Sequence, residues 1–208
     1  MAKKILLPWM HGSKSQLGQE SFVLWILNQK TDGFYIEIGA SHPTNLSNTF
    51  LLESKFSWRG IGLEIDPKLT NYYNQNRSNL CLNLNAIETN YRDLFESQAV
   101  PMKIDYLQVD IEPPKNTYLA LKRVMKSRRI FSVITFEHDL YASKFNYFWK
   151  VRAFFLLRLK GYTRCANNVS NGSAKQEDWY IHKTLGARYR LKSNVDFKEF
   201  FKKSQMLE

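Results

Sequence analysis

The sequence predicts an α/β fold: a three-layer α-β-α, Rossmann-like sheet that is mostly parallel and ends in an antiparallel hairpin. Between residues 33 and 160, short β-favouring apolar segments alternate with helical segments, and this alternation is typical of a parallel sheet covered on both faces. The last two apolar segments are joined by a polar stretch without a helix, so we expect them to pair antiparallel. The chain has 208 residues, 44% of them hydrophobic, which is enough to bury one full sheet.

Seven strands are expected, each bounded by turn-forming residues. Thr31-Asp32-Gly33 precedes the first strand, Trp58-Arg59-Gly60 the second, and Asp66-Pro67 follows the second. Polar residues 170–178 separate the last two strands. The expected strands are residues 34–38, 61–65, 80–84, 104–111, 130–136, 162–169 and 179–183.

Helices are expected between these strands because apolar residues recur there at helical spacing. Ser15 is a suitable cap for the first helix, Pro67 suits the first turn of the third, and Gly161 ends the helix before the hairpin. The expected helices are residues 15–28, 45–56, 68–77, 91–97, 116–128, 143–160 and 197–203. We interpret the chain as a single domain, with a lead-in and helix at 1–32, a sheet core at 33–190 and a closing helix at 191–208.

The helix expected at 143–160 combines aromatic and basic residues, which also suits a helix lying on a membrane surface. Its apolar residues occur on nearly all sides of the helix, so we expect it to pack on the sheet.

The apolar run near the N-terminus is too short for a signal peptide, and no apolar run in the chain reaches the ~20 residues that span a bilayer. Cys81 and Cys165 lack metal-site spacing and are expected as reduced, packed thiols. We therefore expect a cytoplasmic protein.

A formal charge of +11, from 30 Lys and Arg against 19 Asp and Glu, favours anionic partners. Nucleic acid, an acidic glycan, a phosphorylated substrate or a lipid headgroup would satisfy it. The basic residues are spread along the chain, so the charge alone does not select among these partners, and it leaves the oligomeric state open.

In open parallel sheets, ligands bind beyond the carboxyl ends of the strands. This rule selects segments 37–42, 64–66, 85–86, 110–113 and 137–139. Gly39 permits a tight turn after the first strand. The segment lacks both a Gly-x-Gly-x-x-Gly pattern and a Lys-Ser/Thr pair, which disfavours a dinucleotide or triphosphate. Glu64 is placed to accept hydrogen bonds from ribose hydroxyls, and Ser41 and Ile65 belong to the same strand-end segments.

Several short motifs in order resemble those of FkbM-type methyltransferases, over roughly residues 15–140. The motifs are SQLGQE at 15–20, FYIEIGA at 34–40, LSNT at 46–49 with Leu52-Glu53, GIGLE at 60–64 and DYLQVDIE at 105–112. The resemblance implies a class I fold that uses S-adenosylmethionine and methylates hydroxyls of sugars and natural products. It implies that Glu37, Gly39 and Ala40 contact the methionine part of the cofactor and that Glu64 holds the ribose.

By the same resemblance, Asn85 and Ala86 border the adenine and Asp110 faces the methyl-transfer centre. The chain departs from the family in two places. The family commonly has Glu-Gly after the aspartate, whereas here Ile111-Glu112-Pro113-Pro114 follows it, and a later glycine of the first turn is replaced within His42-Pro43-Thr44-Asn45. Both departures leave the acceptor substrate open.

Methylation of a hydroxyl requires a group that accepts its proton. His138 is the first candidate, since it titrates near neutrality and follows the fifth strand; Asp110 and Glu112 are the second candidates. Alternatively, Asp110, Glu137 and His138, with Glu112 and Asp139, could gather around a Mg²⁺ ion that orients the hydroxyl.

We therefore predict an S-adenosylmethionine-dependent O-methyltransferase that acts on a sugar, a glycan or a small metabolite. One alternative is an RNA methyltransferase, suggested by the charge; residues 112–115 (EPPK) only partly match the motif for methylation of base amino groups, because its aromatic residue is missing. Another is a non-catalytic module that binds the cofactor or RNA on the same fold.

Overall fold

The computed structural model describes residues 12–171 and 174–186 of the chain. Its centre is a seven-stranded sheet with the order β3-β2-β1-β4-β5-β7-β6. Strands β1 to β5 are parallel, whereas β7 is antiparallel to both β5 and β6. The strands are β1 Phe34–Ile38, β2 Arg59–Glu64, β3 Leu80–Asn83, β4 Lys103–Val109, β5 Ile130–Glu137, β6 Tyr162–Asn171 and β7 Ala174–His182. The predicted fold class is confirmed.

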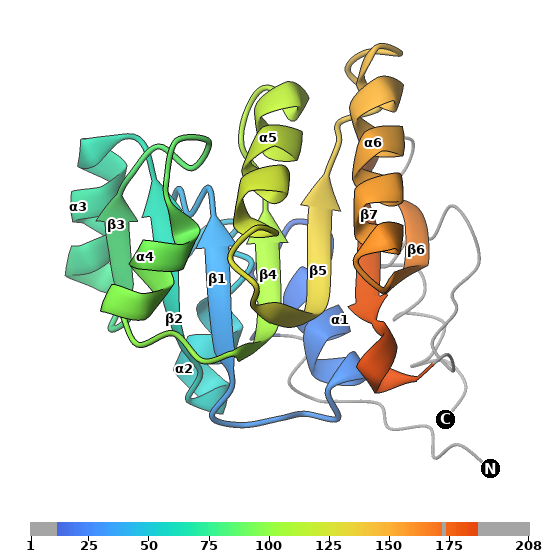
Figure 1. Ribbon diagram of the computed structural model, residues 1–208. Coiled ribbons are helices and arrows are strands. Elements are labelled where there is room, and N and C mark those ends of the chain that lie inside the picture. Colours follow the sequence, from blue (N-terminus) through green and yellow to red (C-terminus); the bar gives the residue numbers. More distant parts are fainter. Residues whose placement is uncertain (1–11, 172–173, 187–208) are drawn as a thin grey trace.

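Helices cover both faces of the sheet (Figure 1). They are α1 Gln19–Ile26, α2 Phe50–Phe56, α3 Pro67–Asn76, α4 Tyr91–Ser97, α5 Pro114–Val124 and α6 Asn146–Leu159, and a short 3-10 turn, Lys183–Leu185, follows β7. In Figure 1, α4, α5 and α6 lie in front of the sheet, and α1 and α2 lie behind it. Helix α3 belongs to the rear face, because the Tyr73 hydroxyl lies 3.1 Å from that of Tyr35, which packs with α1 and α2.

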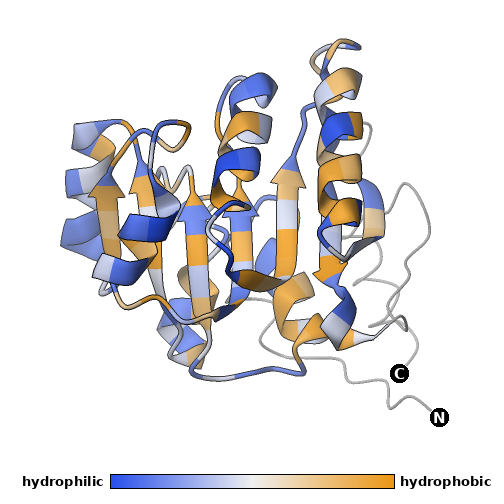
Figure 2. Cartoon of the chain, in the orientation of Figure 1, coloured by the Kyte–Doolittle hydropathy of each residue, from blue (hydrophilic) through white to orange (hydrophobic). Residues whose placement is uncertain are grey.

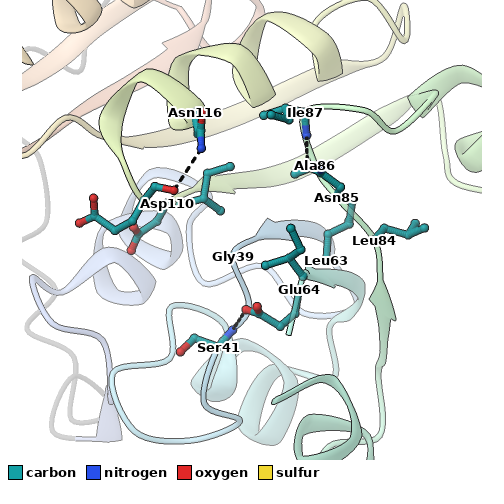
Figure 3. Close-up of a pocket in the computed structure, with 13 residues that line it drawn as sticks. Gly39, Ser41, Leu63, Glu64, Leu84, Asn85, Ala86, Ile87, Asp110 and Asn116 are labelled. Atoms are coloured by element: carbon teal, nitrogen blue, oxygen red, sulfur yellow. Dashed lines mark hydrogen bonds between the residues drawn. The ribbon is translucent and has the colours of Figure 1, made fainter. Parts of the chain in front are cut away.

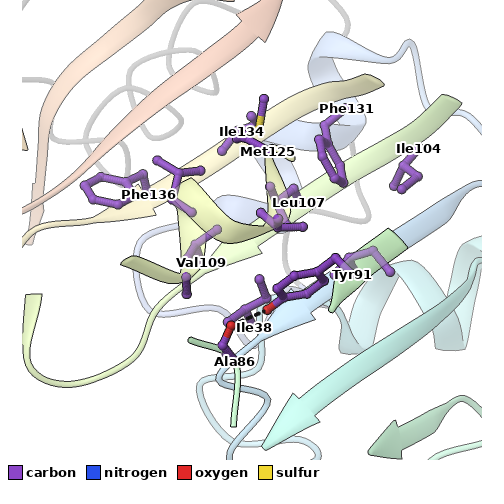
Figure 4. Close-up of a cluster of buried hydrophobic side chains, with 14 of the residues drawn as sticks. Ile38, Ala86, Tyr91, Ile104, Leu107, Val109, Met125, Phe131, Ile134 and Phe136 are labelled. Carbon is purple, nitrogen blue, oxygen red and sulfur yellow. Dashed lines mark hydrogen bonds between the residues drawn. The ribbon is translucent and has the colours of Figure 1, made fainter. Parts of the chain in front are cut away.

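Two apolar clusters form the core, one on each side of the sheet. Alternate residues of β1 divide between them: Ile36 and Ile38 join the front cluster, whereas Tyr35 joins the rear one. Figure 4 shows the front cluster, in which Leu107 and Val109 of β4 meet Phe131 and other residues of β5. Figure 2 shows the strands as mainly hydrophobic, as expected for strands buried on both faces.

Several helix boundaries differ from the predicted ones. Helix α1 begins at Gln19 rather than near Ser15, because Gly18 has φ of 83° and residue 15 instead forms a bridge with Leu46. Helix α2 begins at Phe50 rather than near residue 45, because the preceding residues form a turn in which Ser47 Oγ accepts from the Phe50 amide. Helix α5 ends at Val124, four residues before the predicted end.

The prediction of a loop at residues 170–178 is wrong, because β6 extends to Asn171 and β7 begins at Ala174. The polar character of Gln176, Glu177 and Asp178 led to that prediction. These side chains are buried in the strand, and the carboxylates have partners from other elements, such as Gln19 for Glu177 and Lys150 for Asp178. The predicted lead-in before residue 12 and the helix at 197–203 lie outside the described residues.

No helix in the described part of the chain is long and apolar enough to cross a membrane. Cys81 and Cys165 are both buried free thiols. Helix α6 packs on the sheet through Lys150, Ala153 and Leu157, as predicted, while Phe145, Phe148 and Phe155 are exposed.

Candidate cofactor and acceptor site

A cavity of about 400 Å³ opens at the carboxyl ends of β1, β2, β3 and β4 (Figure 3). Pockets for small molecules commonly have volumes of about 300 to 1,000 Å³. The residues that line it are Gly39, Ser41, Leu63, Glu64, Ile65, Leu84, Asn85, Ala86, Ile87, Asp110, Ile111, Glu112 and Asn116. Seven of the nine residues predicted to bind a cofactor are in this set; Glu37 and Ala40 are not.

Gly39 allows the turn after β1 to pass close to the end of β4. Its φ is 85°, and a Cβ built on it would lie 1.8 Å from the carbonyl oxygen of Asp110. An L-residue rarely adopts this φ and would also overlap the backbone of β4. Glycine at this position therefore allows the turn after β1 and the end of β4, which form two sides of the cavity, to lie this close together.

Glu64 connects two loops at the end of β2. Its Oε2 accepts from the Ser41 amide at 3.0 Å, and its Oε1 accepts from the Asp66 amide at 2.9 Å. A carboxylate has about four acceptor positions. Each oxygen of Glu64 therefore retains capacity for a ligand hydroxyl in the cavity.

The segment after β3 forms another wall of the cavity. Asn85 Oδ1 accepts from the Ile87 amide at 3.2 Å, and the carbonyl of Ala86 accepts from the Tyr91 hydroxyl at 3.1 Å. Asn83 Nδ2 donates to the carbonyls of Glu64 and Ile65 at 3.0 and 2.9 Å, which joins this segment to the end of β2. The wall is thus held by hydrogen bonds within the protein, with apolar Ala86 and Ile87 facing the cavity.

Glu37 and Ala40 lie behind the cavity wall. The Glu37 carboxylate is buried and accepts from the Thr49 hydroxyl at 2.8 Å; burial raises its pKa to about 7. Ala40 packs with Tyr73 and Cys81. Both residues belong to predicted motifs, but their side chains support the turn after β1 from the side away from the cavity.

Arg77 holds the loop that follows this turn. Its guanidinium is buried and donates to the Pro43 carbonyl at 2.8 Å, to Thr49 Oγ1 at 3.1 Å and to the Glu53 carboxylate at 2.7 Å. These carbonyl, hydroxyl and carboxylate partners hold the loop in place, because moving any of them away would leave the buried cation with an unsatisfied donor. No motif in the sequence indicated this role of Arg77.

At the end of β4, the cavity is acidic. Asp110 and Glu112 both line it, and Asn116 Nδ2 donates to the Glu112 carbonyl at 3.3 Å. The carboxyls of Glu112 and Asp139 are neighbours that influence each other electrostatically. Burial raises the pKa of both carboxyls, and the negative charge of Asp139 raises that of Glu112 further. Each of the two carboxyls therefore takes up a proton more readily than an exposed carboxyl does.

Asp110 extends this acidic group. Burial raises its pKa well above the ordinary range, and the charges of Glu177 and Asp139 add to the effect. The charge of Asp139 raises the pKa of the Tyr141 hydroxyl. Asp139 lies two residues beyond the end of β5. The sequence had placed it in the strand-end segment 137–139 and in the alternative metal site, but not as a proton acceptor.

His138 does not line the cavity and is fully buried. Its Nε2 lies 3.3 Å from Asp178 Oδ1 and 3.2 Å from Lys150 Nζ, while its Nδ1 accepts from the Leu140 amide at 3.3 Å. Burial lowers the pKa of His138. With both ring nitrogens engaged inside the protein, His138 holds the loop that carries Asp139.

The structure does not assemble the tentative metal site from Asp110, Glu137 and His138. Within the described ranges, no group of three or more His, Cys, Asp or Glu side chains is placed to hold a metal ion.

The sheet order, the reversed β7 and the cavity at the carboxyl ends define the fold of the S-adenosylmethionine-dependent methyltransferases. The structure is similar to that of a protein described as a putative rRNA-methylase from Clostridium thermocellum, with 14% identity, a TM-score of 0.55, and coverage of 82% of this chain and 98% of that one. It is also similar to Aeropyrum pernix fibrillarin with natively bound S-adenosyl-L-methionine, with 13% identity, a TM-score of 0.57, and coverage of 81% and 74%.

A third similar structure is a putative O-methyltransferase from Klebsiella pneumoniae, with 15% identity, a TM-score of 0.55, and coverage of 79% of each chain. At these identities the likeness establishes the fold. No protein-family model matches the sequence, and no curated protein matches it in sequence either. The FkbM relation thus stays a prediction from the motifs.

Proposed function

We propose that this protein transfers a methyl group from S-adenosylmethionine to a hydroxyl group of a sugar, a glycan or a small metabolite. One observation carries the proposal: a single cavity has Glu64 on one wall and Asp110 and Glu112 on another, with the buried carboxyl of Asp139 beside Glu112. The first wall suits a ribose, and the second suits a hydroxyl that must lose a proton.

The residues present fit the cofactor. Glu64 retains acceptor capacity for ribose hydroxyls, Ala86 and Ile87 offer an apolar wall for the adenine, and Asp110 offers the same cavity a carboxyl whose ionised form a sulfonium would favour. When bound, S-adenosylmethionine supplies a methyl group on a positively charged sulfur. Glu37, which the resemblance assigned to the methionine part, would support the turn rather than contact the ligand.

The acidic wall would orient the acceptor and take its proton. The acceptor hydroxyl would receive the methyl group that the cofactor, held by Glu64, Ala86 and Ile87, would supply. The hydroxyl proton passes to the ionised member of the Glu112–Asp139 pair. Holding the acceptor in line with the breaking bond accounts for much of the rate increase in such reactions.

A nucleic-acid acceptor is the second candidate. The charge of +11 favours an anionic substrate, and one of the similar structures is described as an rRNA-methylase. The carboxyl pair would accept the proton of a ribose hydroxyl equally well. A cofactor- or RNA-binding module without catalysis is the remaining alternative.

The test begins with cofactor binding by calorimetry, using S-adenosylhomocysteine and the wild-type chain. Labelled S-adenosylmethionine is then incubated with separate pools of glycans, hydroxylated metabolites and RNA. We expect binding, and label in the glycan or metabolite pool. Label in RNA alone would select the second candidate, binding without transfer to any pool would favour the module, and no binding would overturn the proposal.

A further inference from the structure

The front face of the molecule carries an exposed apolar stripe along α6. Phe148, Phe155 and Leu159 recur at helical spacing and are 53%, 56% and 86% exposed, and Phe145 continues the stripe beyond the start of the helix. The stripe is about 20 Å long at 1.5 Å per residue. Figure 2 shows hydrophobic and hydrophilic bands alternating along α6. Soluble monomers rarely expose such a continuous apolar surface without a binding role.

The same face is positively charged. Lys144, Arg152, Arg158 and Lys160 are exposed beside the stripe, and neither α5 nor α6 contains an aspartate or glutamate. Helix α5 lies next to α6, since the rings of Tyr118 and Trp149 are 5.6 Å apart. The acidic residues of α4 lie on the other side of α5.

Helix α5 adds cations to this face. Lys115 and Lys122 are two turns apart and exposed, on the side of the helix away from the buried residues Leu121 and Val124. The guanidinium of Arg152 lies 5.3 Å from the ring centres of both Tyr118 and Phe148, which fixes one cation between the two helices. The basic–apolar face is therefore formed by two adjacent helices.

We propose that this basic–apolar face binds the surface of an anionic lipid bilayer. Exposed Phe and Leu side chains would enter the boundary between headgroups and acyl chains, and the surrounding cations would lie at the level of the anionic headgroups. Helix α6 would lie in the plane of the membrane without crossing it. The charge of the face is complementary to such a surface.

Two other occupants fit less well. A second copy of the chain, docked through the same face, would bring Lys115, Lys122, Arg152 and Arg158 of both copies together, and like charges oppose association. The phosphates of a nucleic-acid strand would pair with the cations, but Leu159, the aliphatic residue of the stripe, cannot stack on a base. The apolar residues and the charge together therefore favour lipid.

Co-sedimentation with phosphatidylcholine vesicles, with and without phosphatidylserine, tests the proposal. We expect the protein to sediment only with the serine-containing vesicles, and added salt to weaken binding. Combining Phe155→Ser with Leu159→Ser should weaken binding by about tenfold or more, as should combining Lys122→Glu with Arg158→Glu. Met102→Ser removes a side chain that is 62% exposed before β4 and serves as the control.

Circular dichroism and melting temperature establish that each variant is folded. Wild-type protein that stays in the supernatant with anionic vesicles, or a double Phe155/Leu159 variant that binds as the wild type does, would overturn the proposal. A dimer in analytical ultracentrifugation that the same double variant dissociates would assign the face to self-association instead. Binding of a polyuridylate oligonucleotide that this variant abolishes, without vesicle binding, would assign it to nucleic acid.

Discussion

Replacing Gly39 with alanine tests how the cavity is built. An alanine at φ of 85° costs about 1–2 kcal/mol of stability because its Cβ crowds the backbone. In addition, its Cβ would lie 1.8 Å from the Asp110 carbonyl oxygen, so the two backbones must separate by more than about 1.5 Å to restore a normal contact. Overpacking of this kind costs about 1–3 kcal/mol more. The total loss is about 2–5 kcal/mol.

Gly186→Ala is the control for backbone strain alone, because Gly186 has φ of 80° and its added Cβ would meet nothing within 4 Å among the described atoms. With ψ of 164°, Gly186 lies in a region that is almost exclusive to glycine, so the control should lose only the roughly 1–3 kcal/mol that this backbone conformation costs. Denaturant unfolding measures both losses, and calorimetry measures binding of S-adenosylhomocysteine. Gly39→Ala should weaken that binding on the order of a hundredfold, since it moves two walls of the cavity. If both variants unfold alike and bind alike, the close approach of β1 to β4 does not shape the site.

Three further outcomes are expected. Glu64→Gln replaces an acceptor oxygen with a donor, so it should weaken binding of S-adenosylhomocysteine by more than about tenfold in calorimetry. Asp66→Asn changes a residue outside the cavity and should leave that binding unchanged. If Glu64→Gln binds as tightly as the wild type, Glu64 does not belong to the ribose site. Asp139→Asn should lower kcat by about 10² to 10⁴ with unchanged cofactor affinity, and full turnover would exclude Asp139 as proton acceptor. Buried Glu37 has a folded-state pKa of about 7, above its unfolded value, so the stability it contributes at low pH is lost as pH rises through 7. The melting temperature of the Glu37→Gln variant should therefore fall less between pH 5 and pH 8 than that of the wild type. An equal fall in both proteins would contradict a raised pKa of Glu37.

The sequence was sufficient for the sheet and for most of the cavity. Apolar strand segments ending in small or acidic residues indicated the order of elements, and the rule that ligands bind at carboxyl ends selected Gly39, Glu64, Asn85 and Asp110. The structure places these four residues around one cavity, because strand ends are local features and a parallel sheet brings all of its carboxyl ends to one edge.

The tertiary structure alone decided which side chains at that edge face the cavity. Glu37 and Ala40 lie in a predicted motif, yet their side chains pack against Thr49 and Tyr73 behind the turn. His138 follows β5 as predicted, but Asp178, 40 residues away, and Lys150 draw it inward.

The sequence alone thus determined the class of fold and the edge of the sheet that carries the site. It could not determine that Asp139 meets Glu112, or that polar residues 176–178 are buried in a strand, because both depend on partners distant in the chain. A buried polar group is stable only where a partner satisfies it. That partner is known only once the chain has folded.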